Sequence, residues 1–295
     1  MRGVEWKAIS GGTGVLYTYF ALIPTYRCGD GTVVLIDSGA MAHPELAEDL
    51  DRLGLRVRAV LCTHLHPDHI ANNRLLIDRY GAEIWASARE VRDVVPRYAS
   101  LRADPLEEKW LWTQPDYPIR AIAPGTASLR LGDAVFELLP TPGHVEGHLS
   151  VVTPDGVCCL GDALISRSVL DSSSLPYMEY DVDLAVESMA RLGDTDYPLY
   201  VAAHREVIRP ESLRPLVDAN IKKELGLYDL LRQVVDRPMP MEEAITAFMT
   251  AAGVGREIML RRSSMRGSAA TRFQALIRAG ELEARDGMVS PASRR

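Results

Sequence analysis

Four side chains that commonly bind metals stand together in one short stretch of the sequence. They are His64, His66, Asp68 and His69, within the motif T-H-L-H-P-D-H. Three protonated imidazoles this close would repel one another, and burying them without partners would cost several kcal/mol. A divalent metal removes the conflict because it takes neutral imidazoles and ionised carboxylates as ligands. The motif therefore predicts a metal site, and a polar loop without metal is the weaker alternative.

Three more ligand-type residues follow short apolar runs further along the chain. His144 comes after the alternating segment 134–139, Asp162 after segment 156–160, and His204 after segment 197–203. Side chains at strand ends are held firmly and face a common edge of a sheet. Seven such side chains at four strand ends are enough to bind two metal ions.

The complete set resembles the metallo-β-lactamase superfamily of binuclear metallohydrolases, in the form shared by glyoxalase-II-type and lactonase-type enzymes. The resemblance extends from about Gly12 to His204. It implies a first metal held by His64, His66 and His144, a second held by Asp68, His69 and His204, and a bridging Asp162. Many lactamases of the superfamily have a cysteine ligand where this chain has Asp162, so we do not expect antibiotic hydrolysis.

The resemblance implies hydrolysis by a hydroxide shared between two metals. Two cations roughly 3.5–4 Å apart lower the pKa of a bound water to about 7 and polarise the bond that it attacks. Asp68 is then the catalytic residue that orients the nucleophile, and Asp68 or water protonates the leaving group. Zinc is the expected metal because oxygen-activating diiron relatives usually have a carboxylate at the place of His66; iron and manganese are alternatives.

The expected substrate is a small ester-like molecule, either a thioester or a lactone. The sequence Ala203-His204-Arg205-Glu206 stands where glyoxalase-II-type enzymes usually have Gly-His-Glu-Tyr. Ile165 stands where lactonases often have a tyrosine. These departures leave the choice open, and a phosphodiester is an alternative. A second hypothesis is a sensor or regulatory protein that keeps the metal fold and acts through its C-terminal region, although such a protein would not need an open two-metal centre.

Several other residues are expected to support the metals or the substrate. Asp37 resembles the buried aspartate with which the superfamily orients its metal loop, and His148 is expected behind the ligands, because the seven others already fill both sites. Trp112, Tyr177 and Tyr180 lie in irregular, aromatic stretches between the ligand-bearing strands, and we predict that they contact substrate. The alternatives are a surface helix with a buried aromatic anchor for the first stretch and a polar linker for the second.

Composition limits the class of protein. The chain has 295 residues, is 47% hydrophobic and carries a net charge of −7. No apolar stretch approaches the roughly 18 residues needed to span a membrane, and the N-terminus lacks the apolar core of a signal peptide, so the expected location is the cytoplasm. The four cysteines show no metal or disulfide spacing and are expected to pack in the core. We expect a small-molecule substrate and no membrane partner.

The C-terminal region differs from the rest of the chain. From Pro215 onward it has 13 Lys and Arg against 10 Asp and Glu, leaving 20 against 30 before it. Apolar residues at helical spacing predict helices over residues 213–231, 241–252 and 269–279, followed by a hairpin turning at Asp286-Gly287. We therefore expect a catalytic domain at 1–212 and a helical domain at 213–295. This ending weakly resembles a winged helix. A net charge of about +3 is low for nucleic-acid binding, so docking on the catalytic domain or homodimer formation is expected.

The catalytic region mixes strands and helices throughout. Strands are predicted over residues 15–24, 32–37, 57–62 and 83–86, hairpins over 127–160, and helices over 44–53, 72–80 and 183–192. The family resemblance implies how they are arranged: an α/β fold of four layers, an αβ/βα sandwich with the metals at one edge of its two sheets.

Overall fold

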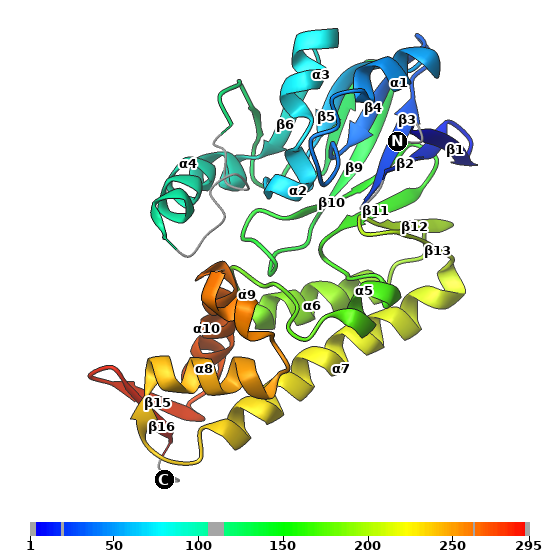
Figure 1. The fold of residues 1–295 in the computed structure, drawn as a ribbon. Helices are drawn as coiled ribbons and strands as arrows, with labels where there is room; N and C mark the ends of the chain where they lie inside the picture. Colours follow the sequence, from blue (N-terminus) through cyan, green and yellow to red (C-terminus); the bar gives the residue numbers. More distant parts are fainter. Residues whose placement is uncertain (1–3, 19–20, 106–114, 262, 293–295) are drawn as a thin grey trace.

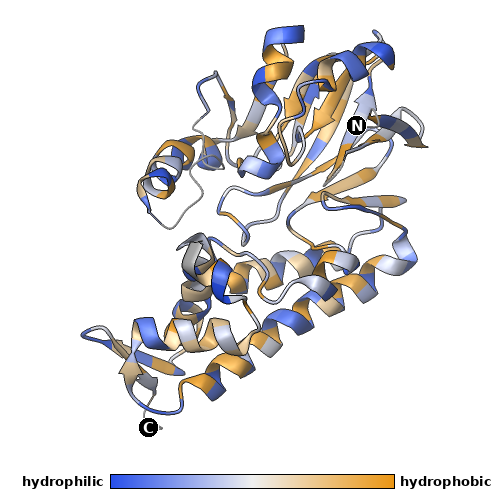
Figure 2. Cartoon of the chain, in the orientation of Figure 1, coloured by the Kyte–Doolittle hydropathy of each residue, from blue (hydrophilic) through white to orange (hydrophobic). Residues whose placement is uncertain are grey.

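In the computed structural model, two β-sheets face each other and helices cover both outer faces (Figure 1). The structure describes residues 4–18, 21–105, 115–261 and 263–292. The predicted four-layer αβ/βα sandwich with a C-terminal helical region is confirmed. Each sheet has one face toward the other sheet and one toward helices, so the central strands of each sheet are apolar and buried on both sides (Figure 2).

The first sheet contains the metal motif. Its seven strands pair in sequence order, antiparallel from β1 to β4 and parallel from β4 to β7. They are β1 (Glu5–Ser10), β2 (Thr13–Tyr17), β3 (Leu22–Arg27), β4 (Thr32–Ile36), β5 (Arg56–Leu61), β6 (Glu83–Ser87) and β7 (Arg120–Ile122). The helices between them are α1 (Leu46–Arg52), α2 (Pro67–Ile70), α3 (Asn73–Tyr80) and α4 (Ala88–Ala103). The parallel strands β4 and β5 end side by side, which brings Asp37 next to the metal motif.

The second sheet contains the other ligand-type residues. Its order is β13-β12-β11-β10-β9-β8, antiparallel except for the parallel pair β11 and β12. The strands are β8 (Ser128–Leu131), β9 (Ala134–Pro140), β10 (Leu149–Val152), β11 (Val157–Gly161), β12 (Leu199–Ala202) and β13 (Glu206–Ile208). Between β11 and β12 lie α5 (Arg167–Ser172) and α6 (Val182–Gly193). Because β11 and β12 are parallel, Asp162 and His204 emerge at the same edge.

The sandwich is held together by three layers of apolar side chains. Between the sheets, Ile36 and Leu61 of the first pack with Phe136 and Val151 of the second. Helices α1 and α3 pack on the outer face of the first sheet, and α6 packs on the outer face of the second. All four cysteines are buried and free, which confirms the prediction that they pack in the core.

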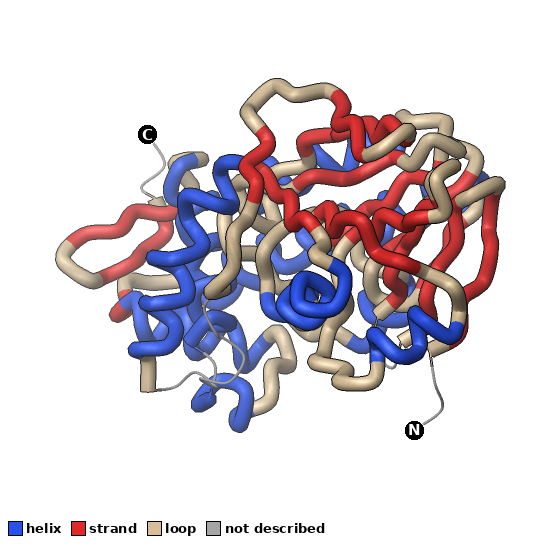
Figure 3. Tube along the Cα trace, turned by 90° about the horizontal axis from the view of Figure 1, so that it is seen from above, coloured by secondary structure: helices blue, strands red, loops and turns tan. Residues whose placement is uncertain are grey.

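The C-terminal region continues the core beneath the second sheet. It contains α7 (Pro210–Val234), α8 (Met241–Ala251), α9 (Arg256–Arg261) and α10 (Ser263–Arg278), with the small sheet β14 (Met239–Pro240), β16 (Met288–Pro291) and β15 (Leu282–Arg285). Helix α7 packs along α6, and one apolar cluster runs from β11 to α10. The predicted boundary after residue 212 falls inside the first turn of α7. Figure 3 shows the terminal hairpin projecting at the end of the molecule away from the large sheets.

Most predicted elements are present, but one predicted strand is divided and several short elements were not predicted. The predicted strand 15–24 is two strands, β2 and β3, because Thr18 closes a turn: its backbone N–H and its hydroxyl both donate to the Ala21 carbonyl, at 3.1 and 2.6 Å. The sequence is apolar on both sides of Thr18 and has no Gly, Asn or Asp there to indicate a turn. The strand β1 and the short helices α2, α5 and α9 were not predicted. Among the described residues, no helix is long and apolar enough to cross a membrane.

Candidate metal centre

The metal motif occupies the loop between β5 and α2 at the open edge of the first sheet. Strand β5 ends at Leu61, and α2 begins at Pro67, where a missing backbone N–H costs no hydrogen bond. Two carboxylates hold the loop backbone by hydrogen bonds. The Thr63 N–H donates to Asp37 Oδ1 at 2.7 Å, and the Leu65 N–H donates to Glu90 Oε2 at 3.0 Å. The motif is therefore held by contacts from β4 and α4 as well as by its own strand.

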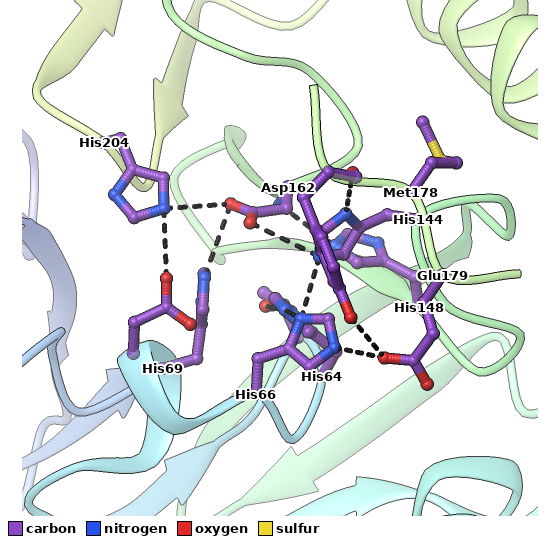
Figure 4. Close-up of polar contacts among 12 residues, drawn as sticks. His64, His66, His69, His144, His148, Asp162, Met178, Glu179 and His204 are labelled. Carbon is purple, nitrogen blue, oxygen red and sulfur yellow. Dashed lines mark hydrogen bonds and ion pairs between the residues drawn. The ribbon is translucent and has the colours of Figure 1, made fainter. Parts of the chain in front are cut away.

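Three histidines converge in a first cluster, shown in Figure 4. Nδ1 of His66 lies 2.9 Å from Nε2 of His64 and 2.9 Å from Nε2 of His144. All three side chains are buried. They come from both sheets, two from the loop after β5 and one from the loop between β9 and β10. These are the three residues expected at the first metal.

Hydrogen bonds on the far side of each ring set which nitrogen of the first cluster carries a proton. His144 Nδ1 lies 3.0 Å from the Tyr177 carbonyl, which only accepts, so Nδ1 is protonated and Nε2 has a lone pair. The Thr63 hydroxyl donates to Asp37 Oδ2 at 2.8 Å and accepts from His64 Nδ1 at 3.1 Å, which leaves the His64 Nε2 lone pair free. His66 Nε2 donates to Glu179. Three lone pairs thus point at one another, an arrangement that a cation stabilises.

A second cluster of four side chains lies beside the first: Asp68, His69, Asp162 and His204. Nε2 of His69 and Nε2 of His204 each lie 3.4 Å from Oδ1 of Asp162, and Asp68 Oδ2 lies 3.7 Å from His204 Nε2. His69 Nε2 is buried and has no hydrogen-bond partner. An orphaned buried nitrogen aimed at two carboxylates fits a metal ligand. These are the four residues expected around the second metal.

Asp162 joins the two clusters. Its Oδ1 faces His69 and His204, while its Oδ2 lies 3.5 Å from His144 Nε2 in the first cluster. Burial opposes its charge, but the attraction of His69 and His204 outweighs burial and holds the pKa of this carboxyl well below its usual range. One ionised carboxylate therefore presents an oxygen to each cluster, as a bridging ligand requires.

The two clusters differ in the direction in which the pKa values of their histidines are shifted. Burial, with repulsion from neighbouring imidazoles, pushes the pKa of His64 well below its usual value, and burial lowers the pKa of His144 to about 4 although Asp162 opposes it. In the second cluster, attraction to Asp162 raises the pKa of His204 against the effect of burial. The rings of His64 and His144 are thus neutral and available to a cation, whereas the histidines of the second cluster face carboxylates.

Asp37 and His148 contact residues of the two clusters from the side away from the neighbouring ligand-type groups. Asp37 Oδ2 lies 2.8 Å from His69 Nδ1, so the ring donates there and leaves Nε2 for a ligand role. His148 Nε2 accepts the Asp162 backbone N–H at 3.0 Å, and its Nδ1 lies 2.8 Å from the Thr141 hydroxyl. His148 therefore fixes the backbone of Asp162, and it belongs to neither cluster.

Glu179 is a residue of the site that the sequence analysis did not single out. Its Oε2 lies 2.7 Å from His66 Nε2, and its Oε1 lies 3.6 Å from Arg97 Nη1. Despite burial, the contacts with His66 and Arg97 lower the pKa of Glu179 to about 2, so it is a carboxylate that accepts from His66. A glutamate between two tyrosines in a loop was the only signal, and its partner is 113 residues away.

The residues predicted to contact substrate lie in different places. The Tyr177 ring centroid is 5.4 Å from that of His66 and 5.7 Å from that of His144. Tyr180 is 43% exposed and lines a separate pocket with Arg89 and Leu184. Trp112 and its neighbour Trp110 lie outside the described residues. Tyr117, in the same stretch, packs against the core of the first sheet, as an anchor would.

A pocket of about 260 Å³ opens beside the first cluster. Arg97 and Leu101 of α4 form one wall, Tyr177 and Glu179 form the second, and the first turns of α10 form the third. Two of its lining residues contact ligand-type histidines directly, so this pocket adjoins the metal centre. The C-terminal region thus reaches the candidate active site.

The fold is that of one known family. The sequence profile of the metallo-beta-lactamase superfamily matches residues 20–204, which is more than half of the chain. The chain belongs to the metallo-beta-lactamase superfamily. The matched segment begins just before β3 and ends at His204, so it contains all seven ligand-type residues.

The curated relatives include hydroxyacylglutathione hydrolases. The protein with this name from Acidiphilium cryptum (strain JF-5) is 31% identical over 206 residues, covering 63% of this chain and 76% of that protein. Hydroxyacylglutathione hydrolase GloC from Haemophilus influenzae is 26% identical over 174 residues, covering 58% of this chain and 78% of that protein. The similarity is thus moderate and leaves a large part of this chain unmatched.

Solved structures match the whole chain. A metallo-beta-lactamase family protein from Thermus thermophilus has a TM-score of 0.72 at 17% identity and covers 99% of both chains. A beta-lactamase domain protein from Burkholderia ambifaria has a TM-score of 0.74 at 19% identity, covering 98% of this chain and 94% of that chain. At these identities the likeness shows the fold, and it includes the C-terminal helices.

Proposed function

We propose that this protein is a hydrolase that uses two divalent metals, most simply zinc, on a small thioester or lactone. The observation that carries the proposal is the pair of adjoining clusters that share Asp162. His64, His66 and His144 would hold the first metal, and Asp68, His69 and His204 the second. Bound there, two divalent cations supply a hydroxide at neutral pH and Lewis acidity toward a carbonyl.

The chain's own residues would orient the reactants and move the protons. Asp68 is the most exposed member of the second cluster, with 46% of its side chain accessible, so its carboxylate is placed to hold a water and later to return a proton to the leaving group. Asp37 and Glu179 fix the ring orientations. The 260 Å³ pocket beside the first cluster has room for a small acyl group next to Tyr177.

The ester-like substrate class is supported by the relatives. The curated proteins at 26% and 31% identity are named hydroxyacylglutathione hydrolases, a name that denotes an acyl group carried on glutathione. A thioester is therefore the first substrate to test. Lactones present the same electrophile, an activated acyl carbonyl, to the same hydroxide.

The test is a substrate screen with the purified, zinc-loaded full-length chain. We expect turnover of a thioester or a lactone. We expect Asp68→Asn to weaken zinc binding at the second cluster and, at zinc concentrations that fill both sites, still to lower kcat by about 100-fold or more, because general acid–base groups contribute roughly 100- to 10,000-fold. Turnover of phosphodiesters alone would replace the proposed substrate class. Absence of turnover in all three classes, with tight binding of DNA or a protein, would favour a regulatory role and overturn the proposal.

A further inference from the structure

The C-terminal helix α10 holds the segment that supports the first cluster. This segment, residues 176–181, crosses between α10 and the metal centre. On its metal side, the Tyr177 carbonyl accepts from His144 Nδ1 and Glu179 accepts from His66 Nε2. The Glu179 backbone N–H also donates to the His144 carbonyl at 2.9 Å. Figure 4 shows Met178 and Glu179 beside His144, with the Glu179 carboxylate facing His66.

The opposite side of the 176–181 segment is hydrogen-bonded to side chains of α10. The Ser268 hydroxyl accepts the Met178 N–H at 2.8 Å and lies 3.3 Å from the Pro176 carbonyl. The Arg272 Nη2 group donates to the same Pro176 carbonyl at 2.9 Å. The Thr271 hydroxyl lies 3.4 Å from the Met178 carbonyl. Backbone groups of Pro176 and Met178 are therefore held by side chains on one face of α10.

Arg272 is itself locked in place by a buried ion pair. Its side chain is 0% exposed, and its Nε and Nη2 groups donate to the two oxygens of Glu224 in α7 at 3.0 and 2.8 Å. Its Nη1 group donates to the Ser268 carbonyl at 2.9 Å. A buried arginine–glutamate pair contributes little net stability compared with apolar residues of the same volume. Its value here is geometric, because the planar guanidinium fixes Pro176 relative to α7 and α10.

We propose that α10 positions the ligands of the first metal, and that Ser268 and Arg272 are positioning residues of the metal centre. The inference rests on the proposed function, since it needs a metal at His64, His66 and His144. Arg272 and Ser268 hold the 176–181 segment by hydrogen bonds. The segment in turn accepts hydrogen bonds from His66 Nε2 and His144 Nδ1, which leaves His66 Nδ1 and His144 Nε2 to face the metal. A metal-binding motif from the catalytic domain thus depends on the C-terminal region for its ring geometry.

The test measures zinc affinity of the full chain by competition with a chelator. Two backgrounds separate the sites: His204→Ala leaves only the first cluster complete, and His64→Ala leaves only the second. Glu179→Gln, which weakens the direct contact to His66, serves as the reference. We expect Ser268→Ala and Arg272→Lys each to weaken zinc binding at the first cluster, by up to about tenfold, with no change at the second.

The matched control is Arg232→Lys. Arg232 also joins two C-terminal elements, through Glu281, but it does not contact the 176–181 segment. It should leave both affinities unchanged. Should Arg272→Lys fail to fold, Ser268→Ala still decides the question, because it removes a single hydroxyl. Wild-type affinity at the first cluster in folded variants, or an equal loss at both clusters with lowered Tm, would overturn the inference. Failure of the unmodified first cluster to bind zinc would instead overturn the proposed function.

Discussion

Oδ2 of Asp37 lies 2.8 Å from Nδ1 of His69, and this contact decides which nitrogen of His69 is available to a metal. Asp37 has a φ of +61°, a left-handed conformation that aspartate and asparagine tolerate better than most residues. Its two oxygens also accept the N–H and the hydroxyl of Thr63. One buried carboxylate therefore sets the backbone of the metal motif and the tautomer of a ligand beyond it.

Asp37→Asn is expected to weaken the second metal site with little change in shape. Asparagine keeps the size and the left-handed backbone, but when its amide group faces His69 it donates to Nδ1 and leaves the proton on Nε2. We expect zinc affinity at the second cluster to fall by about 10- to 100-fold, the usual effect of losing such a partner. Chelator competition in the His64→Ala background measures it. Unchanged affinity there would show that Asp37 only holds the Thr63 backbone.

Much of this centre could be predicted because its ligands follow strands. His64, His144, Asp162 and His204 come after apolar runs that all form strands, and the topology brings those strand ends to one edge. Glu179 could not be found in this way, since a glutamate in a polar loop is usually solvated and its contact with His66 spans 113 residues. The same limit applied to Arg272, which reads as a surface residue of an amphipathic helix but is buried against Glu224.

The fold was predictable to a similar extent. Helix α6 and the hairpin after α10 have clear periodicity and turn residues, and both are present. The turn between β2 and β3 was missed because the run is apolar on both sides of it, so hydrophobic pattern alone could not locate the reversal. The position of the turn is set by the hydrogen bond from the Thr18 hydroxyl to the Ala21 carbonyl, which the hydrophobic pattern does not encode.

Asp162→Ala is expected to abolish metal binding at both clusters, because one oxygen faces each. The unmodified chain should bind close to two zinc ions, and the variant fewer than one under the same conditions. Elemental analysis after dialysis measures this. Cys159→Ala is a suitable control, since Cys159 is buried in β11, the strand that Asp162 follows, and its thiol faces the Val157 carbonyl. This variant should keep its zinc and lose about 1 kcal/mol of stability. Two zinc ions in the Asp162 variant would remove this residue from the centre.

Asp49 should make stability depend on pH at the acidic end. Burial opposes its charge, but hydrogen bonds from Arg52, from the Val4 N–H and from His43 outweigh burial and lower its pKa. Because the folded pKa is below the unfolded one, the unfolded chain binds more protons, and this contribution is present above the unfolded value of about 4 and is lost as pH falls through the folded value.

Asp49→Asn should therefore remove that part of the acid sensitivity. We expect the stability difference between the unmodified chain and the variant to be constant near neutral pH and to shrink below about pH 4. Urea unfolding at a series of pH values, with a chelator present throughout to remove metal effects, measures the difference. A difference that stays constant down to about pH 3 would show that the Asp49 pKa is the same in both states.

Tyr177 and Tyr180 provide a test of where the substrate binds. Tyr177 adjoins the first cluster and lines the 260 Å³ pocket with Glu179, whereas Tyr180 lines a separate pocket with Arg89. Tyr177→Phe should change KM or the preference among acyl groups and leave zinc content unchanged, because the His144 contact uses the Tyr177 backbone carbonyl and the lost hydroxyl makes only a long contact of 3.4 Å with Glu179 Oε2. Tyr180→Phe should leave both unchanged if the pocket beside the first cluster holds the acyl group. Kinetics across a panel of thioesters and lactones measure the two variants. The reverse pattern, with Tyr180→Phe altering preference, would place the substrate on the Arg89 side of the segment.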